Sequence, residues 1–390
     1  MKIRRTIPAA ILLCVLSSSV FAANLINRQA TEETRNLYFN LSKLGPKVMF
    51  GHEDSLAYGT QWWGQGRKAT LNSDIKLVSG AFPAVLGADL GGIGTGNYQN
   101  LDGVKFSDYR YYIQQNFRLG GVNTISWHMY SPVDLHNAWT QKSYVHDLIP
   151  GGRYHNRLIT FLDSFIHFNE RLKVNVNGKK IWIPIIFRPW HEHNGDWFWW
   201  GKGHTSEQDY IALWKFTVDY LNGKGQNNLI YEFSPDRSRL DMQHFRLSYL
   251  YGYAGDKYVD ILGYDNYWDL GHPANLLPAK TQQLMFVQGL EKLTDLAAEK
   301  NKVSALSEGG QEGVTEDHFW TQRFSAGIFA NRKTSRISYA LVWRNNNESG
   351  GEKGHFFGTY PRQKNADDFR SFYHNPDIVL LDTIPDLYHR

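Results

Sequence analysis

Eight short apolar segments with strand character recur along this chain, and helix-like stretches separate most of them. The segments are Val48–His52, Leu77–Leu86, Val122–Trp127, Ile181–Arg188, Leu229–Phe233, Val259–Tyr264, Val303–Leu306 and Ile337–Trp343. The clearest helix-like stretches are Glu32–Leu41, with Thr31 as its N-cap, and Arg157–Phe168, Glu207–Leu221, Thr281–Glu299 and Asp317–Ala330. This alternation predicts a (β/α)8 barrel in a single catalytic domain. The alternative, an open doubly wound sheet, has no Gly-rich phosphate-binding turn to support it.

The fourth segment, Ile181–Arg188, is apolar on both faces, which is typical of a strand in a parallel sheet. Pro184 argues against a continuous strand, because proline has no N–H to donate to a sheet. The segment leads into Trp190-His-Glu192 and then into the aromatic run Trp197–Trp200. A glutamate between a buried strand and a Gly-bounded aromatic loop indicates a catalytic acid that faces a flat, apolar-sided substrate.

Polar and aromatic residues gather at the carboxyl ends of the predicted strands, where a barrel of this kind places its active site. The strand interiors stay mostly apolar. This difference between the strand interiors and their carboxyl ends does not depend on any single motif. The strand ends read Gly51–Asp54, Ser126–His128, Trp190–Glu192, Ser234–Asp236, Tyr264–Tyr267, Ser307–Gly310 and Trp343–Asn345.

Two glutamates, Glu192 and Glu308, match the pair of carboxyl groups that glycosidic bond cleavage requires. Each follows a predicted strand, the fourth and the seventh, and inward-pointing side chains there can approach to the ~5–5.5 Å that a retaining mechanism needs. We expect Tyr267 to donate its hydroxyl to Glu308, and Arg188 or Arg344 to add positive potential beside it. The alternative is that either glutamate is a solvated loop residue.

The sequence His191-Glu-His193 raises the alternative of a zinc site. The helical His-Glu-x-x-His spacing is missing, however, and a third ligand would have to come from His52 or His128. We therefore predict no metal and no other cofactor. His128 and His191 are predicted to hydrogen-bond to sugar hydroxyls or to the carboxylates, with a purely structural role as the alternative.

Aromatic residues make up 15% of the chain and include 13 tryptophans, more than a core alone requires. Because sugar rings have apolar C–H faces that stack on aromatic rings, this excess indicates a carbohydrate-binding cleft. Glycines border the run Trp197–Trp200, which predicts a surface loop in contact with substrate, with Trp197 as a stacking platform. Trp343 is predicted to form the floor at the cleavage point, and Trp62-Trp63 a more distant subsite. The alternative is that these side chains pack in the core.

Residues 1–22 have the pattern of a secretory signal peptide, with Lys2, Arg4 and Arg5 before an apolar stretch and Val20-Phe-Ala22 as the cleavage site. Cys14 lies inside this segment without the flanking residues of a lipid-anchored cysteine. Removing the three signal cations from the 42 basic residues leaves 39 against 38 acidic ones, so the charge gives no argument for nucleic-acid binding. No later run is long enough to cross a bilayer. We expect a secreted or periplasmic monomer whose catalytic domain spans residues 23–390.

Together these motifs resemble those of glycoside hydrolase family 26, the β-mannanases. The resemblance rests on Phe187-Arg-Pro-Trp-His-Glu192 followed by Gly195-Asp-Trp-Phe-Trp-Trp-Gly201, and it extends over most of the chain. Further matching motifs are Gly51-His-Glu-Asp54 with Tyr58-Gly59, Ser126-Trp-His128, Asp260–Tyr267, Ser307-Glu308 and Trp343-Arg344.

The resemblance implies retaining hydrolysis, without a metal, of β-1,4-mannosidic bonds in mannan, glucomannan, galactomannan or manno-oligosaccharides. By position, Glu192 would be the acid/base and Glu308 the nucleophile. The residues expected around the substrate are His128, His191, Trp197, Tyr267, Trp343 and Arg344. Two alternatives stay open: an exo-acting enzyme that releases mannobiose, with segment 98–103 or 130–153 closing one end of the cleft, and a non-catalytic mannan-binding protein.

Overall fold

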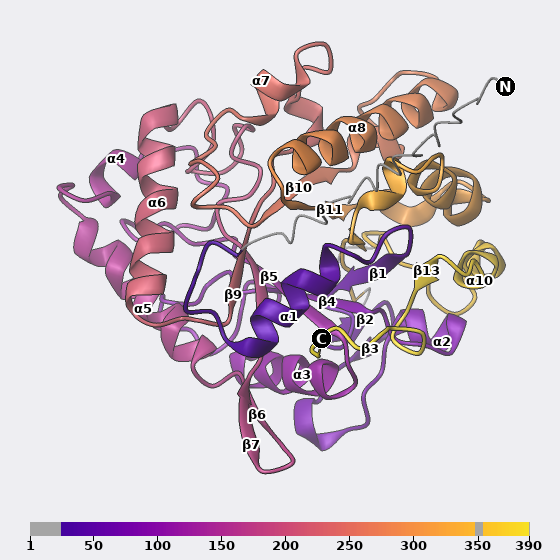
Figure 1. Cartoon of the computed structure of the whole chain (residues 1–390), viewed down its shortest axis with the longest axis horizontal. Coiled ribbons are helices and arrows are strands. Elements are labelled where there is room, and N and C mark those ends of the chain that lie inside the picture. Colours follow the sequence, from indigo (N-terminus) through magenta and orange to yellow (C-terminus); the bar gives the residue numbers. More distant parts are fainter. Residues whose placement is uncertain (1–24, 348–353, 390) are drawn as a thin grey trace, which may run out of the picture.

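Eight parallel strands close into a barrel in the computed structural model, which describes residues 25–347 and 354–389 (Figure 1). In barrel order the strands are β1 (Val48–Glu53), β4 (Val85–Asp89), β5 (Val122–Ser126), β8 (Ile185–Arg188), β9 (Leu229–Phe233), β10 (Ile261–Asn266), β11 (Val303–Gly309) and β12 (Tyr339–Val342). The barrel closes where β12 pairs with β1, from Met49 opposite Tyr339 to His52 opposite Val342. The predicted (β/α)8 barrel is confirmed, and the open sheet is wrong because its two edges pair with each other.

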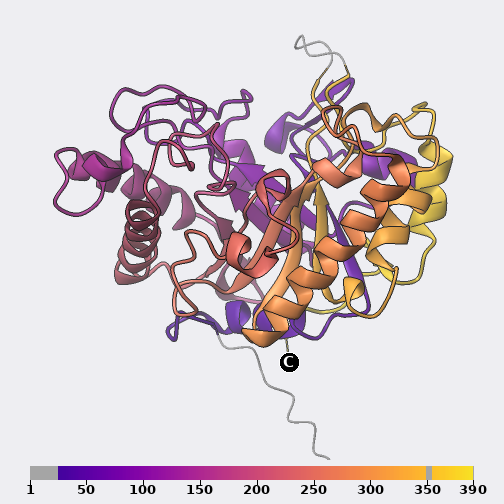
Figure 2. The same cartoon turned by 90° about the horizontal axis from the view of Figure 1, so that it is seen from above.

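Helices surround the strands on the outside, as Figures 1 and 2 show from two directions. The longer ones are α1 (Glu32–Leu41), α3 (Phe106–Arg118), α5 (His155–Asn169), α6 (Glu207–Gly223), α8 (Ala279–Glu299) and α10 (Ala366–Tyr373). As predicted, α1 begins after Thr31, whose hydroxyl accepts the Thr34 N–H at 3.3 Å. All residues of the eight barrel strands are buried, so each strand is covered by side chains inside the barrel and by helices or loops outside.

The remaining elements are short and lie in the connections. The strands are β2 (Tyr58–Gly59), β3 (Trp62–Trp63) and β13 (Ile378–Val379), which pairs with the start of β1. The helices are α2 (Asp74–Ser79), α4 (Val145–Leu148), α7 (Phe245–Tyr249) and α9 (Ala326–Ile328). Single 3-10 turns occupy Gly66–Lys68, Arg237–Arg239, Trp268–Leu270, Glu312–Val314 and Thr334–Arg336.

The second predicted strand, Leu77–Leu86, is wrong over most of its length, because Leu77–Ser79 belong to helix α2. Ser73 caps this helix, and Gly80 ends it in the left-handed conformation, with φ of 92°. The strand itself begins only at Val85 and continues to Asp89. A cap and a terminating glycine thus divide an apolar stretch that reads as one strand in the sequence.

The fourth predicted strand is also two elements, and Pro184 separates them. Lys179–Trp182 forms β7, which pairs with β6 (Lys173–Val176) in a hairpin outside the barrel. Only Ile185–Arg188 joins the barrel, as β8. Similarly, the predicted helix Asp317–Ala330 is a π-helical stretch, Phe319–Ser325, followed by the short α9.

Within residues 25–347 and 354–389, no helix is both long enough and apolar enough to cross a membrane. The predicted signal peptide, residues 1–22, lies outside the described residues.

Gly51 on β1 tests how tightly the barrel interior is packed. A Cβ at this position would lie 3.1 Å from the Cβ atoms of both Leu341 and Val85 on the neighbouring strands. Because those atoms are attached directly to the backbone, Gly51→Ala should destabilise the fold by about 1–3 kcal/mol. Gly223→Ala is the matched control, since a Cβ there meets nothing within 4 Å and a helix favours alanine by up to about 1 kcal/mol. Urea unfolding of both variants gives the comparison, and equal effects would contradict tight packing at Gly51.

Candidate active site

A strained turn after β8 presents Glu192 to the mouth of the barrel. Trp190 and Glu192 both have φ of 53°, a left-handed conformation that side chains with a Cβ rarely adopt. The Glu192 N–H donates to the Ser234 carbonyl at 2.8 Å, which ties the turn to the end of β9. Trp190 packs behind the turn and donates its indole N–H to Thr217 at 3.1 Å. Such strain persists only where the surroundings enforce it, and it is commonest at functional sites.

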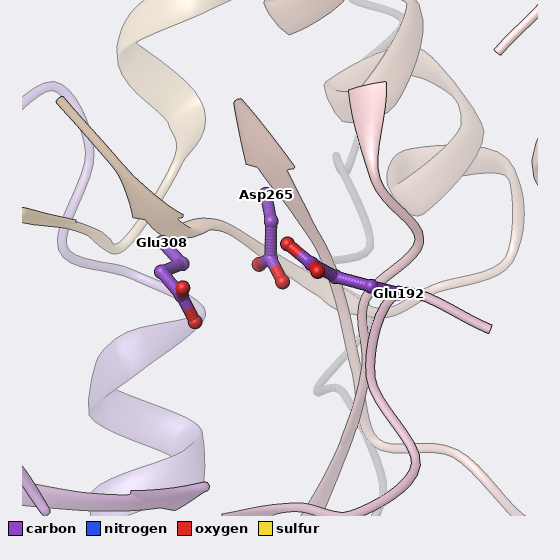
Figure 3. A group of neighbouring side chains, drawn as sticks. All are labelled: Glu192, Asp265 and Glu308. Atoms are coloured by element: carbon purple, nitrogen blue, oxygen red, sulfur yellow. The ribbon is translucent and has the colours of Figure 1, made fainter. Parts of the chain in front are cut away.

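Three carboxylates from three different segments converge at this mouth (Figure 3). One oxygen from each of Glu192, Asp265 and Glu308 lies within 4.8 Å of the other two. Asp265 is on β10 and Glu308 is on β11, and the strands that carry them are neighbours in the barrel. The approach of Glu192 and Glu308 matches the short carboxyl separation of retaining glycosidases, about 5–5.5 Å.

Arg188, at the end of β8, supplies the positive charge for this cluster. Its guanidinium contacts the Glu308 carboxylate and lies 2.8 Å from Asp265 Oδ2, and all three side chains are buried. Tyr267 donates its hydroxyl to Glu308 Oε1 at 2.7 Å, which is the contact expected from the sequence. A cation and a hydroxyl donor thus fix the orientation of the Glu308 carboxylate.

Glu192 has the opposite environment. Burial, followed by the negative charges of Asp236, Asp265 and Glu308, raises the pKa of Glu192 well above its usual value. A hydrogen bond of 2.7 Å from the indole N–H of Trp197 opposes this only in part. The Glu192 carboxyl group therefore favours its protonated form, whereas the Glu308 carboxylate accepts hydrogen bonds from Arg188 and Tyr267. Such a difference between two nearby carboxyl groups is what acid and nucleophile roles require.

The imidazoles of His128 and His191 form a buried chain beside the carboxylates. His128 Nδ1 lies 2.8 Å from Asp89 Oδ2, and its Nε2 lies 3.2 Å from His191 Nε2. Although burial lowers the pKa of His128, the Asp89 carboxylate outweighs it and raises that pKa. Burial, Arg188 and His128 lower the pKa of His191. His191 is only 1% exposed, so its predicted contact with substrate stays a prediction, whereas His128 lines the cleft directly.

An elongated cleft runs across the mouth of the barrel as two cavities that share His128, Trp139 and Trp343. The first, about 590 Å³, holds Glu192 and Glu308. Its lining also includes Trp197, Asp236, Arg239, Trp268 and His272. The second, about 850 Å³, extends past Asp102, Arg344 and His355 to Trp63. A cleft with the carboxylates inside it and aromatic rings along both arms can hold several linked sugar units.

The structure resolves two sequence expectations about this cleft. Of the two arginines expected beside Glu308, Arg188 makes the contact, whereas the Arg344 guanidinium pairs with Asp102 at 3.1 Å and lines the second cavity. Of the run Trp197–Trp200, only Trp197 is partly exposed in the cleft as predicted; Phe198, Trp199 and Trp200 are at most 2% exposed. The loop folds back so that their rings pack against Trp190 and His191, and it therefore contributes to the core.

The two histidines beside Glu192 do not converge on a common point. His193 directs its Nε2 to the Tyr251 carbonyl at 2.6 Å and stacks on Tyr210, whereas His191 contacts His128. Within the described residues, the cluster able to share a metal ion is instead Glu192, Asp265 and Glu308. Arg188 already pairs with two of these carboxylates, Asp265 and Glu308, so a bound cation would have to compete with the guanidinium.

Sequence reasoning passed over three residues that shape the site. Asp265 and Asp89 both end barrel strands, so their position was a usable signal, but neither belongs to a recognisable catalytic pair. Trp139 stacks on His128 with ring centroids 5.0 Å apart and is 46% exposed to the cleft. It comes from the long loop after β5, where no local pattern indicates which aromatic ring faces the cleft.

Comparisons with known proteins identify the family of this chain and agree with its barrel fold. The model of Glycosyl hydrolase family 26 matches residues 26–313, which is most of the chain. The chain belongs to glycosyl hydrolase family 26. It is therefore a glycoside hydrolase by family, and its barrel is the family fold.

The family 26 relatives include enzymes and structures named for mannan hydrolysis. A β-mannanase of this family from Bacteroides ovatus is 35% identical, with a TM-score of 0.82, and the alignment covers 92% of this chain and 98% of that one. A modular endo-β-1,4-mannanase from Cellulomonas fimi is 30% identical, also with a TM-score of 0.82, over 94% and 79% of the two chains. A mannan endo-1,4-beta-mannosidase from Bifidobacterium adolescentis is 28% identical over 94% of this chain. The chain spans only 36% of that relative's length.

Asp89 should control the protonation of His128. Because the Asp89 carboxylate raises the pKa of His128, Asp89→Asn should lower this pKa. An NMR titration of the His128 ring resonances measures the change without reference to activity. Asp134→Asn is the matched control, since Asp134 pairs with Lys142 in the loop after β5. An unchanged His128 titration in Asp89→Asn would contradict the assigned ion pair.

Proposed function

We propose that this family 26 hydrolase cleaves β-1,4-mannosidic bonds in mannan, glucomannan, galactomannan and manno-oligosaccharides, with retention of anomeric configuration. The observation that carries the proposal is the close approach of two carboxyl groups with opposite environments, Glu192 and Glu308. The names of the B. ovatus, C. fimi and B. adolescentis relatives support mannan as the substrate.

In the first step, Glu308 is the nucleophile. Its carboxylate oxygen forms a bond to the anomeric carbon while the bond from that carbon to the leaving oxygen breaks. Glu192, whose pKa is raised by burial, transfers its proton to the leaving oxygen. Arg188 and Tyr267 orient the Glu308 carboxylate for attack, since both hold its oxygens directly. The products are a glycosyl-enzyme and the released sugar chain.

In the second step, Glu192 acts as a base. Now ionised, it takes a proton from a water molecule whose oxygen attacks the anomeric carbon, and the bond to Glu308 breaks. The two inversions give net retention, and both carboxyl groups return to their starting states. The indole N–H of Trp197 stabilises the ionised Glu192 of this step, because it donates to the carboxylate.

The walls of the cleft supply substrate contacts. We assign Trp343 and Trp197 to opposite sides of the cleavage point, because Trp343 lines both cavities and Trp197 only the one that holds the carboxylates. We assign His128 to a hydrogen bond with a sugar hydroxyl, and Arg344, which pairs with Asp102, to a sugar contact in the second cavity. Export to the periplasm or outside the cell, and action as a monomer, are part of the proposal.

A second candidate is exo action on chain ends, and one observation favours it. Leu101 and Asp102, from the segment between β4 and α3, line the second cavity beyond Trp343. Asp102 is almost fully buried against Arg344, and the Asn100 side chain accepts the backbone N–H groups of Asp102 and Val104. A wall held by these contacts would limit the number of sugar units that fit into the second cavity. The relatives' names favour endo action instead.

Substitution of the two glutamates should have different consequences. Glu308→Ala should abolish turnover of all mannan substrates, because no glycosyl-enzyme forms. Glu192→Ala should lower kcat/KM on mannan by about 10²–10⁴-fold but largely spare the first step on aryl mannosides with good leaving groups. Steady-state and burst kinetics separate the two steps. Glu299→Ala, on the outer surface of α8, is the control, and equal mild losses in both active-site variants would contradict the roles.

The products of mannohexaose should distinguish the two modes of action. Endo cleavage gives a spread of product lengths from the earliest time points, whereas exo cleavage gives mannobiose alone. Newly formed β-anomer, followed by NMR in the same reaction, is expected for retention. Binding without release of any sugar would instead identify a non-catalytic mannan-binding protein.

A further inference from the structure

Glu232 is a carboxyl group inside the barrel that the mechanism above does not use. It lies on β9, next to the strand that carries Arg188, and it is 0% exposed. Its Oε2 accepts the hydroxyl of Tyr339 from β12, while Oε1 has no hydrogen-bond partner in the described part of the chain. A buried oxygen without a partner costs about 1–3 kcal/mol, so its retention calls for an explanation.

The unpartnered oxygen borders the hydrogen-bonded groups of the active site. A Cβ at Gly263 of β10 would lie 2.5 Å from Glu232 Oε1 and 2.6 Å from Ser307 Oγ, so both atoms occupy the space that this glycine leaves open. Ser307 donates to Asp265 Oδ1 at 2.8 Å. Asp265 in turn pairs with Arg188, and Arg188 contacts Glu308. Glu232 therefore lies beside the connected groups Ser307, Asp265, Arg188 and Glu308, although its Oε1 is not hydrogen-bonded to any of them.

The charged and titratable groups that face Glu232 come from several elements. Arg188 of β8 is the cation that favours its ionised form, and Tyr339 of β12 is its hydrogen-bond donor. Tyr249 of α7, whose hydroxyl donates to the Gly263 carbonyl at 2.6 Å, interacts electrostatically with Glu232 and Asp265. Burial raises the pKa of Glu232 to about 7, although Tyr339 and Arg188 both oppose this rise.

We propose that Glu232, together with Tyr339, is a positioning residue that acts through Arg188. When Glu232 is ionised, three carboxylates, those of Glu232, Asp265 and Glu308, interact with the single positive charge of Arg188. When Glu232 is protonated, only Asp265 and Glu308 do so. The proton on Glu232 thus sets the pH range in which the pair Glu192 and Glu308 works. This inference rests on the proposed function, since it concerns the roles assigned there.

The sign of the effect follows from the charge. Ionised Glu232 adds a negative charge to a site whose carboxylates already raise the pKa of Glu192. Removing that charge should lower the pKa of Glu192, which must be protonated to act as the acid. In Glu232→Gln the alkaline limb of the kcat/KM profile should therefore move to lower pH. Tyr339→Phe removes a donor to the ionised form, so it should move the limb in the same direction by a smaller amount.

The experiment compares pH profiles of kcat/KM on a soluble manno-oligosaccharide for wild type, Glu232→Gln, Tyr339→Phe and the double variant. The double variant should match Glu232→Gln, because Tyr339 acts only through Glu232. Tyr38→Phe is the matched control: it also removes a buried hydroxyl, which donates to the Asp260 carbonyl at 2.8 Å, and it should lower Tm without moving the alkaline limb. If Glu232→Gln does not fold, the pH profile of Tyr339→Phe alone tests the proposal.

The outcomes separate this inference from the proposed function. An active wild type whose alkaline limb is unchanged in Glu232→Gln and Tyr339→Phe, with only Tm lowered, would overturn the inference alone. A wild type that releases no sugar would reject the proposed function and this inference with it. A shift in both variants, absent from Tyr38→Phe, would support the positioning role.

Discussion

The guanidinium of Arg188 lies inside the barrel among carboxylates that would otherwise repel one another. It contacts Asp265 and Glu308, and its charge also reaches Glu232. Removing one partner from a buried ion pair typically costs about 3–5 kcal/mol, because the other charge is left without compensation. The fold and the chemistry therefore depend on the same side chain. Arg188 makes a cluster of buried acids tolerable, and it holds the proposed nucleophile in place.

The barrel brings together side chains that are far apart in the sequence. Glu192, Asp265 and Glu308 come from three different strand ends, and Asp89 and His128 from two others. Because parallel strands all end at the same mouth, each contributes one or two residues without a long loop to carry them. Rigid strands also hold these groups at distances that a mobile loop would not maintain. The resulting site has one carboxyl group in an apolar, acidic environment and another held by donors.

The sequence pattern was most informative where a strand ended in polar residues. That signal placed Glu192, Glu308, His128 and Tyr267 correctly at the mouth. It failed where local capping or a proline divided an apolar stretch, as at Gly80 and Pro184. It also failed for Trp199 and Trp200, because an aromatic run between glycines reads the same whether it faces sugar or core. The sequence did not decide between the two arginines expected beside Glu308: Arg188 makes that contact, and Arg344 pairs with Asp102.

The sequence by itself determined the barrel, the two glutamates and the family to which the chain belongs. Periodicity and strand-end chemistry are local properties, and they remain visible in the order of the residues. Only the tertiary structure decided which groups share a hydrogen bond or an ion pair: Arg188 with Glu308, Asp89 with His128, and Tyr339 with Glu232. The physical reason is that these contacts join different strands, so their geometry is set by the closure of the barrel and by the packing inside it.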